Sequence, residues 1–106
     1  MPRSRALEQV VAVDLEAVAK VRQEGTYSAA ARALGVSPTR VRQRVQRYLN
    51  REWEARHPPV VPVWERRLLW TDRLPPERKR AHLDYCEARE AWIEEWCWRL
   101  RQGEEL

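Results

Sequence analysis

Two glycines and a Ser-Pro pair divide the first half of this chain into three helical segments. Gly25 and Gly35 are followed by Ser37 and Pro38. Glycine ends helices because it accepts a left-handed backbone, whereas a serine followed by proline caps and opens a helix. The spacing predicts helices over residues 4–24, 29–34 and 38–53.

Apolar residues recur at helical spacing within these segments. The first segment carries such a stripe at Leu7, Val10, Val11, Leu15, Val18 and Val21. Asp14 interrupts it, and we expect this residue to cap or kink the helix partway. On the third segment the apolar face consists of Val41, Val45, Tyr48 and Leu49, and the opposite face of Thr39, Gln43, Gln46, Arg47 and Asn50. Each helix therefore has one side to bury and one side for solvent.

Two short helices joined by a tight glycine turn, with another helix packed across them, have the layout of a helix-turn-helix. Ala30 and Ala31 are small, which lets the third helix approach the second. A small core is expected from Leu34, Val36, Val41 and Val45. The polar face of the third helix is then free to enter a DNA major groove.

The segment from Gly25 to Val45 reads G-T-Y-S-A-A-A-R-A-L-G-V-S-P-T-R-V-R-Q-R-V. It resembles the N-terminal DNA-binding segment of LysR-type regulators, over roughly residues 12–50. The stretch S-P-T-R-V-R-Q-R is also similar to the promoter-reading helix of sigma factors, but the LysR spacing fits better. No winged hairpin is apparent after Leu49, and 106 residues leave no room for the effector domain of full LysR-type regulators. We therefore do not expect their mode of small-molecule induction.

The resemblance implies two sets of DNA contacts. Residues expected to read base edges are Thr39, Arg42, Gln43, Gln46 and Arg47. Residues expected to hold phosphates are Arg32, Arg40, Arg44, Arg51, Thr26 and Ser28. Arginine pairs with guanine and glutamine with adenine in such grooves. An ordinary exposed helix face is the alternative interpretation of the Gln and Thr residues.

Basic charge is concentrated in the same half of the chain. Residues 1–51 hold 10 basic and 4 acidic side chains, a balance of +6, whereas residues 52–106 hold 10 and 12, a balance of −2. Arginine supplies 18 of the 20 cations, which suits planar contacts with phosphates, although GC-rich coding gives the same bias. The basic half is the one expected to meet a polyanion.

The prolines divide the chain into three parts. We expect a helix-turn-helix domain over residues 1–54, a proline-containing linker with a short helix over 55–75, and a C-terminal helix within 76–106. The apolar segment 63–70 reads as helix or strand, and its spacing favours helix. Pro75 and Pro76 open the last helix, which we expect to end near Gln102.

The last helix has a wide apolar surface. Its stripe consists of Tyr85, Ala88, Trp92, Trp96 and Leu100, with Cys86, Ile93 and Cys97 beside it. Three interpretations remain open: it folds back on the first half with Trp64 and Trp70 as core, it pairs two chains, or it docks another protein such as RNA polymerase. For a homodimer, the expected interface is Tyr85, Trp92, Ile93, Trp96 and Leu100.

Several classes of function find no support in the residues. Cys86 and Cys97 lie about 16 Å apart by helix rise and cannot form a disulfide within the chain. His82 and Cys86 supply two of the four ligands that structural zinc needs, so no metal site is expected. There is no Gly-rich phosphate loop or nucleophile–histidine motif, so we expect no enzyme activity and no cofactor. No apolar run approaches a membrane span, and we expect a cytoplasmic protein.

Together these observations predict an all-α protein, with an N-terminal three-helix helix-turn-helix domain and a long C-terminal helix. We expect sequence-specific binding of double-stranded DNA by a small dimeric transcriptional regulator. Two alternatives remain: a factor that contacts RNA polymerase or another protein through its Trp-rich half, and the DNA-recognition subunit of a phage packaging machine.

Overall fold

The structure is a computed structural model that describes residues 2–106, with side chains described from Ala6 onward. All regular secondary structure in this part of the chain is helical, which confirms the all-α prediction. The helices are α1 (Pro2–Glu24), α2 (Tyr27–Leu34), α3 (Pro38–Arg56), the short 3-10 helix η1 (Val63–Leu68) and α4 (Pro76–Arg101). No strand occurs among the described residues, so no winged hairpin follows α3.

The turn between α2 and α3 has the expected local chemistry. Gly35 adopts a left-handed conformation with φ 71°, and its N–H donates to the Ala31 carbonyl. The Thr26 hydroxyl accepts a hydrogen bond from the Ala29 N–H, which caps α2. The Ser37 hydroxyl accepts one from the Arg40 N–H at 3.1 Å and caps α3. These caps satisfy N–H groups that have no partner within the helix.

The core forms where the second half of α1 crosses α2 and α3. Ala17 and Val21 of α1 are fully buried, as are Val41, Val45 and Leu49 of α3. Small residues let the helices approach closely here, since Ala30 and Ala31 of α2 are 0% and 2% exposed. Cys97 and Leu100 of α4 close this core from another side.

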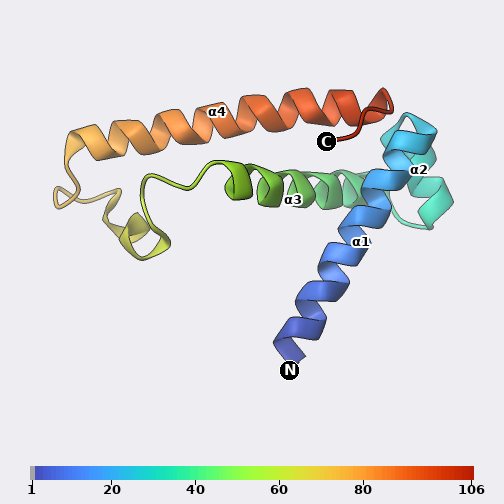
Figure 1. Cartoon of the computed structure of the whole chain (residues 1–106), viewed down its shortest axis with the longest axis horizontal. Coiled ribbons are helices and arrows are strands. Elements are labelled where there is room, and N and C mark those ends of the chain that lie inside the picture. The colour runs from blue at the N-terminus through green and yellow to red at the C-terminus, as the bar shows by residue number, and fades with distance from the viewer. Residues whose placement is uncertain (1) are drawn as a thin grey trace.

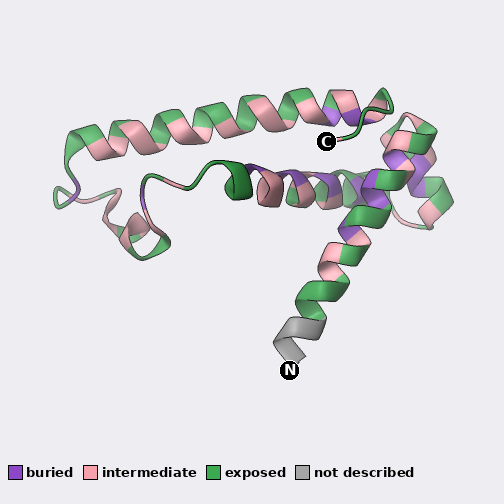
Figure 2. Ribbon diagram, in the orientation of Figure 1, coloured by how far each residue is buried: buried purple, intermediate pink, exposed green. Residues whose placement is uncertain are grey.

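The molecule is elongated. The first half of α1 projects away from the other helices, and its residues 6–13 are mostly exposed, while α4 runs back alongside α3 in the opposite direction (Figures 1 and 2). The radius of gyration is 16.4 Å, against about 13 Å expected for a compact domain of this length. Among the described residues, no helix is long and apolar enough to cross a membrane.

The connection between α3 and α4 is anchored by two buried residues and one ion pair. Val61 and Leu74 are buried, and Glu65 forms an ion pair with Arg78 of α4. Trp64 and Trp70, by contrast, are 69% and 89% exposed. The expectation that these two tryptophans join the core is therefore wrong: Trp64 on η1 and Trp70 in the turn after it both face solvent.

The apolar stripe of α4 packs within the chain. Trp92 lies against Trp53 of α3 with ring centroids 5.6 Å apart, and Trp96, like Ile93, packs partly buried on the core. The Tyr85 hydroxyl donates to the His57 carbonyl at 2.6 Å. Leu100 is only 1% exposed and cannot contact a second chain, which corrects its assignment to a dimer interface. Of the three interpretations of this stripe, folding back on α3 is the one found.

Candidate nucleic-acid interface

The exposed face of α3 begins at its capped N-terminus. Thr39, Arg40 and Gln43 are all exposed there, on the side of the helix opposite Val41 and Val45. Because residues three and four apart share a helix face, these side chains form one surface. The structure thus brings together two of the expected base-reading residues and one expected phosphate contact.

Four arginines of α2 and α3 have no acidic partner within the described part of the chain. Among the side chains described, no carboxylate lies within 4.0 Å of the guanidinium groups of Arg32, Arg40, Arg42 or Arg44. Arg44 is half-buried and the other three are exposed. This end of the molecule therefore carries uncompensated positive charge.

The two hydroxyls expected to hold phosphates lie at the start of α2. Thr26 and Ser28 are both exposed. The Thr26 oxygen already accepts the capping hydrogen bond from Ala29, so its hydroxyl proton is the group left for another acceptor. Both residues stand where the positive end of the α2 dipole lies.

Two further residues of the expected set, Arg47 and Arg51, are engaged inside the protein. The Arg47 guanidinium donates to both oxygens of Asp14, at distances between 2.7 and 3.1 Å. Arg51 donates to the same carboxylate at 2.7 Å. The Asp14 side chain is fully buried, whereas 49% of the Arg47 side chain and 32% of that of Arg51 are exposed. Hydrogen bonding to Asp14 raises the pKa of Arg47.

Asp14 was missed as a partner of α3 by sequence reasoning. α1 is one continuous helix through this residue, so Asp14 neither caps nor kinks it. One feature of the sequence did indicate such a contact: Asp14 is a single acidic residue within the apolar stripe that includes Val18 and Val21. A buried carboxylate requires a cationic partner, and the arginine-rich third helix was the nearest source.

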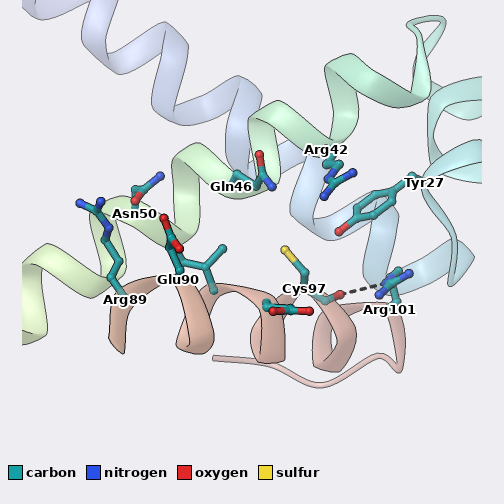
Figure 3. A pocket seen from close by; sticks show the side chains of 10 residues that line it. Tyr27, Arg42, Gln46, Asn50, Arg89, Glu90, Cys97 and Arg101 are labelled. Atoms are coloured by element: carbon teal, nitrogen blue, oxygen red, sulfur yellow. Dashed lines mark hydrogen bonds between the residues drawn. The ribbon is translucent and has the colours of Figure 1, made fainter. Parts of the chain in front are cut away.

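The remaining expected residues, Arg42 and Gln46, face a groove between α3 and α4. Together with Asn50 they form the α3 wall of the groove, and α4 forms the opposite wall (Figure 3). The groove has a volume of about 840 Å³. Its α4 residues are Arg89, Glu90, Ile93, Glu94, Cys97 and Arg101. No pattern in the sequence indicated this groove, because it depends on α4 returning along α3.

Tyr27 closes one end of the groove. Arg101 lies over its ring, with the guanidinium carbon 5.2 Å from the ring centroid. Burial raises the pKa of Tyr27, and hydrogen bonding to Cys97 adds to this effect, whereas the charges of Arg101 and Arg42 oppose it. Tyr27 is therefore a neutral hydrogen-bond donor at physiological pH.

The described residues contain no group of three or more His, Cys, Asp or Glu side chains that could hold a metal ion. Cys86 and His82 approach each other at 3.4 Å between Sγ and Nε2, as an isolated pair. Comparison with known proteins adds no relative: no protein-family model, no curated protein and no solved structure matches this chain.

Proposed function

We propose that this protein binds double-stranded DNA through α3 and acts as a small transcriptional regulator. One observation carries the proposal: the exposed, capped start of α3 presents Thr39 and Gln43 near Arg40 and Arg44, which have no acidic partner among the side chains that the structure describes. Unpaired positive charges on neighbouring side chains attract a polyanion.

The side chains divide by role in this proposal. Gln43 and Thr39 occupy the middle of the exposed surface and would meet base edges. Arg40 and Arg44 lie near it on α3, Arg32 is exposed on α2, and all three would bind phosphates. Arg47 holds α3 against α1 through Asp14.

A dimer is also part of the proposal, because helix-turn-helix proteins commonly address two half-sites. The α4 stripe packs on its own α3, so a contact between copies would need other apolar residues. Leu7 and Leu15, which are 61% and 49% exposed on α1, are the natural candidates. Sedimentation of wild type against Leu7→Glu tests this, and a wild type that stays monomeric at high concentration removes the dimer from the proposal.

Duplex binding measured over a salt series tests the DNA proposal. We expect log K to fall linearly with log salt, by about 0.9 for each phosphate contact. Arg40→Ala is expected to flatten this slope by about one contact, because it removes an unpaired exposed cation. Arg67→Ala is the matched control: Arg67 is also exposed, but it lies on η1 and should leave the slope unchanged.

Specificity needs a separate variant. Gln43→Ala should reduce the difference in affinity between the preferred and a scrambled duplex, with little change in salt slope, because glutamine carries no charge. Undetectable or salt-independent binding of the wild type to duplex DNA would overturn the proposal.

A further inference from the structure

The groove between α3 and α4 holds charges of both signs that do not pair with one another. Arg42, Arg89 and Arg101 contribute guanidinium groups, and Glu90 and Glu94 contribute carboxylates. Within the described side chains, none of these five residues takes part in an ion pair. Elsewhere on the same helix, Glu95 and Arg99 do pair, at 3.0 Å. The groove therefore keeps both kinds of charge available for a ligand.

Two of the three guanidinium groups lie at one end of the groove, and the third, that of Arg89, lies near Glu90 at the other end (Figure 3). Arg42 from α3 and Arg101 from α4 lie beside Tyr27, and Figure 3 shows all three at the same end of the groove. The Tyr27 hydroxyl stays protonated and can donate a hydrogen bond. Two guanidinium groups and a phenol are a suitable set for a carboxylate or another small anionic group.

The acidic charges lie farther along α4. Glu90 and Glu94 are one turn apart on the same face, and both are exposed. Two carboxylates repel a nucleic-acid strand but attract an ammonium group. Along the helix axis, Glu94 is about 10 Å from Arg101, and side chains that lean toward each other shorten this span.

We propose that this groove binds a small zwitterionic molecule, with its anionic group between Arg42 and Arg101 and its cationic group against Glu94 and Glu90. The groove volume of about 840 Å³ lies within the range of small-molecule sites. Gln46 and Asn50, which line the α3 wall, supply amide groups for further hydrogen bonds.

Binding there affects DNA if the proposed function holds. Arg42 and Gln46 belong both to the groove and to the residues expected to read bases. If Arg42 and Gln46 also contact the duplex beside Thr39 and Gln43, a ligand that engages them removes two of these contacts, so ligand and duplex compete. Linkage then requires that DNA lower the affinity for the ligand by the same factor.

The ligand step is tested by nuclear magnetic resonance on the full chain. The probes are glycine, 4-aminobutanoate and 6-aminohexanoate, three zwitterions of increasing charge separation. Each is added to about 10 mM, which is about ten times a weak dissociation constant of about 1 mM. We expect at least one to shift the side-chain amide signals of Gln46 and Asn50, and to leave that of Gln9 on α1 unchanged. Hexanoate and hexylammonium, which each keep one charge, should bind at least tenfold more weakly.

A pair of exposed glutamates supplies the matched variants. Glu94→Gln should lower the affinity for the best zwitterion at least tenfold, whereas Glu87→Gln, outside the groove on the same helix, should not change it. Shifts that persist equally in Glu94→Gln, or that hexanoate alone reproduces at equal affinity, overturn the zwitterion site.

Duplex titrations with and without the zwitterion then separate the two proposals. We expect saturating ligand to weaken DNA binding several-fold. If the wild type binds duplex with a steep salt dependence while none of the three zwitterions shifts Gln46 or Asn50, the groove proposal is wrong and the DNA proposal stands. If the amide signals shift but no duplex binds, the site stands and the DNA proposal is wrong.

Discussion

Asp14 and Arg47, 33 residues apart in sequence, lock α1 onto α3 through a fully buried carboxylate. Arg51 adds a second guanidinium to the same carboxylate, so one acid holds two arginines of the helix proposed to meet DNA. Burial of a charge is costly unless it is paired and hydrogen-bonded, and here both carboxylate oxygens accept hydrogen bonds. The orientation of α3 relative to α1 therefore depends on this contact.

Replacing Asp14 should destabilise the fold. Asp14→Asn keeps the side-chain volume but leaves Arg47 and Arg51 facing a neutral group. Breaking a buried pair typically costs 3–5 kcal/mol; because both arginines are partly exposed and can be hydrated, we expect about 2–4 kcal/mol in urea unfolding. Glu16→Gln, on an exposed position of the same helix, is the control and should change stability by less than about 0.5 kcal/mol. A loss below about 1 kcal/mol for Asp14→Asn would show that the contact does not hold the helices together.

At Gly35, the turn between α2 and α3 should tolerate only residues that can adopt a left-handed backbone conformation. Gly35 has φ 71°, and a Cβ added there meets no atom within 4 Å. The cost of Gly35→Ala is therefore conformational rather than steric with neighbours, and we expect about 1–2 kcal/mol. Gly35→Asn should cost less, since asparagine enters the left-handed region more readily than alanine. Thermal unfolding of the two variants checks the order, and equal stability of Gly35→Ala and wild type would contradict it.

The tryptophans of the second half should separate into structural and solvent-facing groups. Trp92 lies against Trp53 of α3 and is partly buried, whereas Trp70 is 89% exposed. Trp92→Ala should cost about 2–3 kcal/mol, somewhat less than a fully buried tryptophan. Trp70→Ala should leave the unfolding free energy within about 0.5 kcal/mol of wild type. If instead Trp92→Ala kept full stability and only reduced association between copies, the packing of α4 on α3 would be wrong.

The parts of this fold that local chemistry determines were predictable from the sequence. Gly35, Ser37 and Pro38 fix where α2 ends and α3 begins, because each acts on its own stretch of backbone. In the same way, Pro76 fixes where α4 begins, and Gly103 marks where it ends. The all-α class and the order of the helices follow from these signals.

Contacts between distant helices were not predictable in the same way. Where α4 packs depends on whether Trp92 contacts residues of its own chain or of another chain. An apolar stripe is equally suited to both kinds of contact. Arg47 had the spacing of an exposed face and Arg51 was expected to hold a phosphate, yet Asp14 of α1 engages both. The groove that includes Arg42 and Gln46 arises only after α4 has returned along α3.

Alkaline pH should weaken the fold through two partly buried tyrosines, Tyr27 of α2 and Tyr48 of α3. Burial raises the pKa of Tyr27 well above its usual 10, and burial also raises that of Tyr48. Each folded-state pKa exceeds its unfolded value, so the stabilisation is complete below about pH 10 and is lost as the pH rises from there toward the folded pKa. In that window the unfolded chain loses the proton first, and stability should fall by up to about 1.4 kcal/mol per pH unit for each tyrosine.

Tyr27→Phe isolates the larger contribution. Phenylalanine keeps the ring beneath Arg101 but has no hydroxyl to ionise. The stability of the variant should therefore fall less steeply than that of wild type above about pH 10. Urea unfolding at a series of pH values measures the slope for both proteins, and tyrosinate absorbance of the folded wild type reports the delayed ionisation directly. Because the Arg101 and Arg42 charges favour the ionised phenol, Arg101→Gln should raise the pKa of Tyr27 further and delay its ionisation. Parallel stability curves for wild type and Tyr27→Phe through about pH 11 would show that Tyr27 ionises as freely in the folded protein as in the unfolded chain.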